Sequence, residues 1–214
     1  AQQVIELQAQ KLNAPIISYE VNKKTKGFVY KDKNLELALP TPALQGEHQI
    51  YNAAMAITCV NQLIDLSADK IIQALKQVKW PARLQKLTVQ DDCELWLDGG
   101  HNIAAASMIA DWLNAKAQKD NYFICAMMSD KDHAEFLNIL KPYVKKLYTV
   151  PIENNPKALN AETLAQLANE QAIKAQAANS VLEAIDLIKQ QDGQKNIIIS
   201  GSLNMAGEVL EKLQ

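Results

Sequence analysis

Residues 98–102, Asp-Gly-Gly-His-Asn, gather a carboxylate, an imidazole and an amide in one turn. An apolar-alternating segment precedes them and an alanine-rich run follows, which predicts a strand, a turn and a helix. Open α/β sheets place ligands at the carboxyl ends of strands, and glycines there let a ligand approach the backbone closely. The free N–H groups of the helix favour an anion. The alternative is that Asp98 and Asn102 only cap the helix.

Two further polar residues stand where a binding site could use them. Asn52 lies one turn into a predicted alanine-rich helix, and its amide could read the edge of a base with one donor and one acceptor. Arg83 lies in the stretch 80–85, and a guanidinium grips phosphate with a fork of donors. The simpler interpretations are a surface amide for Asn52 and a solvated linker charge for Arg83.

Two other turns join a predicted strand to a predicted helix. Residues 200–204, with Ser202, offer hydroxyls and backbone N–H groups to a carboxylate or phosphate. Residues 127–132 contain Asp130 and Asp132, which we expect to cap the next helix, and Lys131 could meet an anion. Each of these turns is weak as a single motif.

The composition is that of an ordinary globular protein of one large or two small domains. The 214 residues are 48% hydrophobic with a formal net charge of -2, which does not indicate a nucleic-acid or membrane-surface binder. Cys59, Cys93 and Cys125 are far apart in apolar settings, so we expect reduced core thiols in a cytoplasmic protein. No run approaches the roughly 18 apolar residues of a membrane span.

The first part of the chain predicts an incomplete α/β domain. Its opening residues resemble the middle of an amphipathic helix, which suggests an excised fragment. We expect helices over residues 2–12, 50–66 and 69–78, a strand over 16–19, and a hairpin of strands 27–30 and 35–39. Residues 80–83, Trp-Pro-Ala-Arg, break the pattern and predict a linker.

After the linker, predicted strands and helices alternate. The expected strands are residues 84–89, 93–97, 122–127, 146–150, 173–177 and 196–199, and the expected helices are 103–117, 134–140, 161–168, 181–190 and 205–213. This alternation predicts an α/β fold: a doubly wound, mostly parallel, Rossmann-like domain. The short α/β part before the linker is expected to be the tail of a larger domain. Neither G-x-x-x-x-G-K-[ST] nor G-x-G-x-x-G occurs, so the chain has no phosphate-gripping loop of its own.

Five stretches together resemble one family. GEHQIYNAA, WPARLQ, LDGGHN, MMSDKD and SGSLNMAGEV are similar, in order and spacing, to the dihydrofolate synthase/folylpolyglutamate synthase family, ATP-dependent amide ligases related to the Mur ligases. The resemblance covers the whole chain but only the second half of such an enzyme. It implies that residues 1–82 are the end of the central ATP-binding domain and residues 83–214 the C-terminal Mur-ligase-like domain.

The resemblance also implies roles for single residues. Asn52 matches an asparagine that contacts adenine, Arg83 an arginine that reaches ATP from the hinge, and Asp98 an aspartate of the ATP site. His101 and Ser202 match positions associated with the incoming glutamate. No catalytic residue or metal ligand is implied within this chain, because the family's phosphate loop and magnesium ligands would precede it.

The chain departs from the family pattern at two positions. The family's Pro-Gly-Arg is Pro81-Ala82-Arg83 here, which we expect to stiffen the hinge slightly. The family's His-Asn-Pro is His-Asn-Ile here, so a favoured first-turn proline is replaced by Ile103 while the polar groups stay.

The implied reaction joins L-glutamate to dihydropteroate and/or folates, with ATP and Mg2+, through an acyl phosphate. The implied partners are these small molecules, without nucleic acid or membrane, and the implied state is a monomer. A Mur-type cell-wall ligase and a non-catalytic α/β nucleotide-binding module remain open as alternatives. Gln49 argues mildly against a Mur-type ligase, because Mur ligases usually carry Asn at the matching position.

Overall fold

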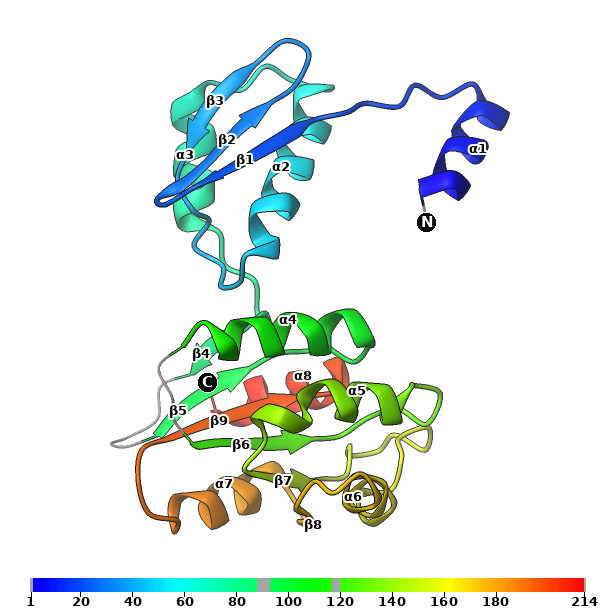
Figure 1. Ribbon diagram of the computed structural model, residues 1–214, viewed down its shortest axis with the longest axis vertical. Coiled ribbons are helices and arrows are strands. Elements are labelled where there is room, and N and C mark those ends of the chain that lie inside the picture. Colours follow the sequence, from blue (N-terminus) through cyan, green and yellow to red (C-terminus); the bar gives the residue numbers. More distant parts are fainter. Residues whose placement is uncertain (1, 88–92, 117–119, 214) are drawn as a thin grey trace. The chain divides into compact units, whose positions relative to one another are not determined.

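The computed structural model describes residues 2–87, 93–116 and 120–213, which form two compact units (Figure 1). The amino-terminal unit comprises the residues up to Ala43 together with Glu47–Lys79. The carboxyl-terminal unit comprises Leu44–Gly46 and the residues from Trp80 onward. No described helix is long and apolar enough to cross a membrane.

The amino-terminal unit is a small antiparallel sheet with helices. Its elements are α1 (Gln2–Leu12), β1 (Glu20–Lys24), β2 (Gly27–Lys31), β3 (Glu36–Leu39), α2 (His48–Asn61) and α3 (Ala68–Gln77), and the strand order is β1-β2-β3. The core forms between the strands and α2 and α3, and includes Phe28, Tyr30 and Ile57. The predicted hairpin is therefore confirmed, and the helices lie within a few residues of their predicted ends, except that α2 stops at Asn61.

One strand of this unit was predicted in the wrong place. Residues 16–19 have no regular structure, and the strand lies just after them, at β1. The sequence of β1 is Glu-Val-Asn-Lys-Lys, and Val21 is its single partly buried side chain. An exposed edge strand needs no apolar alternation, so the pattern gave no signal for it.

The carboxyl-terminal unit confirms the predicted α/β fold. Its strands are β4 (Gln85–Leu87), β5 (Cys93–Leu97), β6 (Asp120–Cys125), β7 (Lys146–Thr149), β8 (Ala175–Ala177) and β9 (Lys195–Ser200). They form one six-stranded sheet in the order β4-β5-β9-β6-β7-β8, parallel except for β4. Residues 88 and 89 of the strand expected over 84–89 lie outside the described residues.

Helices cover both faces of this sheet (Figure 1). They are α4 (Ile103–Asn114), α5 (His133–Leu140), α6 (Ala161–Glu170), α7 (Val181–Lys189) and α8 (Leu203–Leu213), with a short 3-10 turn, η1 (Lys141–Tyr143), after α5. The core on one face contains side chains of α7 and α8, and the other core contains those of α4, α5 and α6. Strand β9 lies in the middle, with Ile197 and Ile199 in the first core and Ile198 in the second.

Candidate functional site

The candidate site is built at the carboxyl ends of β5 and β9, which are neighbours in the sheet. The turn after β5 is joined to the turn after β9 through the carbonyl oxygen of Gly100. This oxygen accepts hydrogen bonds from the Gly201 N–H at 2.8 Å and from the Ser200 hydroxyl at 3.1 Å. The two turns, which are about a hundred residues apart in sequence, are thus held together by hydrogen bonds.

The packing of these turns requires glycine at positions 100 and 201, whereas at Gly99 a new side chain would meet only the end of the flexible Leu203 side chain. A Cβ on Gly99 would lie 2.3 Å from a Leu203 methyl, and one on Gly100 would lie 2.5 Å from the Cβ of Ala105. Gly201 has a φ of +118°, and its Cβ would lie 2.6 Å from the carbonyl oxygen of Ala126. Protein atoms therefore approach the backbone closely at Gly100 and Gly201, and the close approach of a ligand stays a prediction.

Asp98 directly follows β5 and is buried, and both of its carboxylate oxygens accept backbone hydrogen bonds. Oδ2 accepts from the Leu84 N–H at 2.9 Å, and Oδ1 accepts from the Gly100 N–H at 2.7 Å. The carboxylate thus ties residues 82–84 to the glycine turn. A hydrogen bond to a charged acceptor is among the stronger ones, so this link stabilises both segments.

Asn102, and not Asp98, caps the following helix. The Asn102 side chain accepts the N–H of Ala105 at 2.9 Å, and its extended backbone is that of an N-cap. The capping interpretation is therefore confirmed for Asn102 and wrong for Asp98, whose oxygens bind the turn and the segment before β4.

Arg83 lies between two residues with left-handed backbone. Ala82 has a φ of 55° and Leu84 a φ of 41°. The Arg83 side chain is half-buried, and no ion pair or side-chain hydrogen bond to its guanidinium is present within residues 2–87, 93–116 and 120–213. A guanidinium in this situation is available to an anionic ligand.

His101 and Ser202 lie on the two joined turns. The Nδ1 of His101 is 3.0 Å from the carbonyl oxygen of Gly99, so Nδ1 donates, and Nε2 is the acceptor in the tautomer that carries its proton on Nδ1. The buried Ser202 hydroxyl accepts from the Asn204 N–H at 3.1 Å and the Met205 N–H at 3.4 Å, which caps α8. Its O–H remains one possible donor.

Asn52 belongs to the amino-terminal unit, unlike the other predicted site residues. It is exposed on α2, and its Nδ2 donates to the Gln49 Oε1 at 3.1 Å. The Gln49 Nε2 in turn lies 2.9 Å from the His48 Nε2. The three side chains form a chain of contacts along the first turn of α2, which fixes the orientation of the Asn52 amide.

The turn after β6 is a helix start with an added ion pair. Asp132 caps α5 by accepting the Glu135 N–H at 3.1 Å, as predicted, whereas Asp130 does not cap. The Lys131 ammonium donates to Asp130 at 3.2 Å and holds the pKa of that carboxyl below its ordinary value. His133, the first residue of α5, is half-buried, with Nε2 2.9 Å from the Met128 carbonyl oxygen.

Sequence reasoning missed Gln85. Its Oε1 accepts the N–H of Ala82 at 2.9 Å, next to Arg83. Its presence within the WPARLQ stretch was the one signal available, because a side-chain contact to a backbone three residues away has no sequence pattern of its own.

The prediction of three core thiols was also wrong in one case, since Cys59 is exposed while Cys93 and Cys125 are buried.

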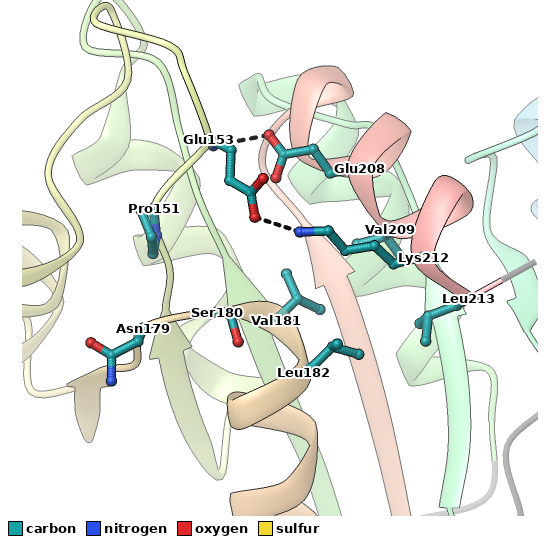
Figure 2. Close-up of a pocket in the computed structure, with 10 residues that line it drawn as sticks. All are labelled: Pro151, Glu153, Asn179, Ser180, Val181, Leu182, Glu208, Val209, Lys212 and Leu213. Carbon is teal, nitrogen blue, oxygen red and sulfur yellow. Dashed lines mark hydrogen bonds and ion pairs between the residues drawn. The ribbon is translucent and has the colours of Figure 1, made fainter.

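The carboxyl-terminal unit also has a pocket away from these turns, between the loop after β7, the start of α7 and the end of α8 (Figure 2). None of the predicted site residues lines it. The Glu153 N–H donates to the Glu208 carboxylate at 3.0 Å, and Lys212 pairs with Glu153 (Figure 2). Burial raises the pKa of Glu208 above its ordinary value. These contacts join α8 to the β7 loop.

Comparison with known proteins assigns the carboxyl-terminal unit to a class. Residues 82–212 match the family model described as "Dihydrofolate synthetase, C-terminal domain". The fold is that of the Mur ligase-like α/β domains of glutamate ligases. The chain belongs to the dihydrofolate synthase/folylpolyglutamate synthase family.

Individual relatives agree with this assignment. The chain is 26% identical over 191 residues to the "Folylpolyglutamate synthase" of Lacticaseibacillus casei, covering 87% of this chain and 43% of that protein. Its fold is similar to "E.coli FolC in complex with ADP", with a TM-score of 0.84 and 23% identity over 97% of this chain and 50% of that one. A bifunctional folylpolyglutamate synthase/dihydrofolate synthase "with Mn, AMPPNP and L-Glutamate bound" gives a TM-score of 0.83 at 25% identity, over 99% and 50%. The chain thus spans about half the length of the proteins it matches.

Proposed function

We propose that this chain is the C-terminal half of an ATP-dependent ligase that adds L-glutamate to dihydropteroate, to folates, or to both. The observation that carries the proposal is the family match over residues 82–212, the part that holds the joined turns. The relatives named above include a folylpolyglutamate synthase and a bifunctional enzyme with a bound nucleotide analogue and L-glutamate. Under this proposal residues 1–82 complete a central ATP-binding domain, and residues 83–214 form the C-terminal domain.

We assign a nucleotide contact to one residue of each unit, Asn52 in the amino-terminal unit and Arg83 in the carboxyl-terminal unit. The amide of Asn52 has the donor and acceptor needed to read an adenine edge. The Arg83 guanidinium, which no described side chain pairs, fits a phosphate with its fork of donors. We assign Asp98 to the same site, where its two backbone contacts fix the segment that carries Arg83.

The incoming amino acid would lie near His101 and Ser202. The proposed reaction needs the amine of glutamate as a nucleophile, and the His101 Nε2 can accept a hydrogen bond from an amine. The Ser202 hydroxyl can donate to a carboxylate while its oxygen caps α8. In the ligase, these groups bind and orient glutamate, so that its amine lies within attack distance of the activated carboxylate.

A magnesium ion would neutralise phosphate charge in this reaction. Among the residues that the structure describes, no three His, Cys, Asp or Glu side chains group closely enough to hold a metal ion. As part of this proposal, we place the magnesium ligands and the phosphate loop in the remainder of the full-length ligase.

The test uses the full-length ligase that carries this sequence. ADP release is measured with ATP, Mg2+ and L-glutamate, and with dihydropteroate, tetrahydrofolate or a UDP-linked cell-wall precursor as acceptor. The proposal expects glutamate-dependent ADP release with at least one of the first two acceptors. Turnover with the cell-wall precursor alone would assign a Mur-type ligase instead, and nucleotide binding without turnover would indicate a non-catalytic module.

A further inference from the structure

The backbone on both sides of Arg83 is held in a conformation that side-chain-bearing residues rarely adopt. Ala82 and Leu84 both lie in the left-handed region, with φ of 55° and 41°. Such conformations persist where the surrounding structure over-determines them, and they cluster at functional sites. The contacts that impose this conformation therefore determine the position and direction in which the Arg83 side chain leaves the backbone.

The first set of contacts is apolar. Ala82 is buried in the core that contains α7 and α8, and Leu84 is buried in the core that contains α4, α5 and α6. The residues on either side of Arg83 are thus anchored in opposite layers of the domain. Arg83 between them is half-buried.

The second set of contacts is polar. The Ala82 carbonyl oxygen accepts the Gly99 N–H at 2.9 Å, and the Ala82 N–H donates to the Gln85 Oε1 at 2.9 Å. Gln85 is itself fixed, because it begins β4 and pairs with Leu97, the residue before Asp98. A side chain on a rigid strand thereby completes the hydrogen bonds of the residue before Arg83.

We propose that Gln85 is a positioning residue for Arg83. By binding the Ala82 N–H it stabilises the left-handed backbone and so presents the guanidinium to the nucleotide phosphate. This inference rests on the proposed function, and in particular on the role of Arg83. Gln85 itself is not required to touch ATP.

The test compares two variants of Gln85 in the full-length ligase. Gln85→Met keeps the length of the side chain but removes the acceptor, whereas Gln85→Glu keeps an acceptor for the Ala82 N–H. We expect Gln85→Met to lower kcat/KM for ATP about three- to tenfold, as the loss of one neutral hydrogen bond implies. Gln85→Glu should recover most of this loss. In an Arg83→Ala background Gln85→Met should not lower kcat/KM for ATP any further, because the guanidinium that Gln85 positions is absent.

Asn169→Ala is the matched control. In α6, the Asn169 Oδ1 accepts the Ala175 N–H at 3.0 Å, as Gln85 accepts that of Ala82, and the Asn169 Nδ2 also donates to the Ala175 carbonyl oxygen at 3.0 Å. Both Asn169→Ala and Gln85→Met should lower Tm, because each removes a hydrogen bond, but Asn169→Ala should leave kcat/KM for ATP unchanged. Unchanged kinetics in Gln85→Met, or an equal loss in both backgrounds, would overturn the positioning role. Normal ATP kinetics in Arg83→Ala would instead overturn the proposed nucleotide contact and the inference with it.

Discussion

Both carboxylate oxygens of Asp98 are engaged by the protein itself, through the N–H groups of Leu84 and Gly100. The first of these comes from 14 residues earlier in the chain. No local pattern encodes such a contact, so the sequence could mark Asp98 as functional without showing what it binds. Its placement in the ATP site stays a prediction, and the observed contacts show how it would act there: through the segment of Arg83.

Asp98→Asn should reduce stability as well as activity. An amide has one oxygen, so one of the two backbone N–H groups would face an NH2 and lose its acceptor. A buried donor left unpaired costs about 1–3 kcal/mol, and Tm should fall accordingly. If the full-length protein is the proposed ligase, kcat/KM for ATP should fall with it, because the Leu84 N–H helps to hold the Arg83 segment.

Asp111→Asn provides the control for this change. Asp111 is an exposed carboxylate on α4, so its neutralisation should leave both Tm and kinetics near the wild-type values. Thermal melts and ATP titrations of the two variants decide the matter. A fully stable Asp98→Asn protein would contradict the role we derive from the backbone contacts.

Cys125 should make the carboxyl-terminal unit sensitive to alkali. Burial raises the pKa of its thiol from 9.0 to about 12. The folded state therefore keeps the proton longer than the unfolded state does. The stability from this group is fully present below pH 9.0 and is lost as the pH rises through about 12. Urea unfolding between pH 8 and about 12 should show this decline, and Cys125→Ala should show a shallower one. Parallel curves for the two proteins would contradict the assignment.

At the scale of elements, the turns of the site depend on glycine more than on any polar side chain. The Gly201 turn combines a φ of +118° with a hypothetical Cβ only 2.6 Å from both the Ala126 carbonyl oxygen and the Cys125 Sγ. The carbonyl cannot move away without disturbing the end of β6. These turns are therefore rigid, which suits a site that must hold small ligands.

Gly201→Ala and Gly207→Ala should consequently have opposite effects. The first should destabilise the carboxyl-terminal unit by about 2 kcal/mol or more, because backbone strain and overpacking add. The second lies in α8 with nothing within 4 Å of a new Cβ, and should stabilise by about 0.5–1 kcal/mol through helix propensity. Denaturant midpoints of the two variants provide the comparison. A similar stability change in both would mean that the Gly201 turn can relax.

The elements of the carboxyl-terminal unit were largely predictable, and their contacts were not. Apolar runs such as Ile197–Ile199 belong to a strand buried on both faces, and these give a strong signal. The antiparallel direction of β4 depends on pairing with β5, which no periodicity reveals. In the site, the polar residue types and their places at strand ends could be predicted. The Gln85 contact and the use of both Asp98 oxygens by backbone depend on tertiary packing and could not.

At the scale of the whole molecule, the two units differ in how completely each buries its apolar surface. The carboxyl-terminal unit has a core on each face of a six-stranded sheet. The amino-terminal unit has one small core, and α1 buries no residue although Val4, Ile5 and Leu7 recur on it at helical spacing. An 11-residue helix without packing is marginal in water, so α1 should open readily.

Limited trypsin digestion of this chain should therefore begin in the amino-terminal unit and stop at a defined point. Cleavage after Lys11, at the end of α1, should be among the first events. The resistant fragment should begin at Trp80, because Lys79 is exposed, whereas Arg83 is half-buried between residues fixed by Gln85 and Asp98.

Mass spectrometry of the resistant fragment decides between the two cleavage points. Proteases cut segments that open locally, and we expect the Gln85 contact to protect the peptide bond after Arg83. The resistant fragment should therefore begin at Trp80 in the wild type and at Leu84 in Gln85→Met. Arg83→Lys, which keeps a trypsin site, should retain the Trp80 start and serves as the control. A wild-type fragment that already begins at Leu84 would show that the 82–84 segment opens freely, and earlier loss of the carboxyl-terminal unit would contradict its greater stability.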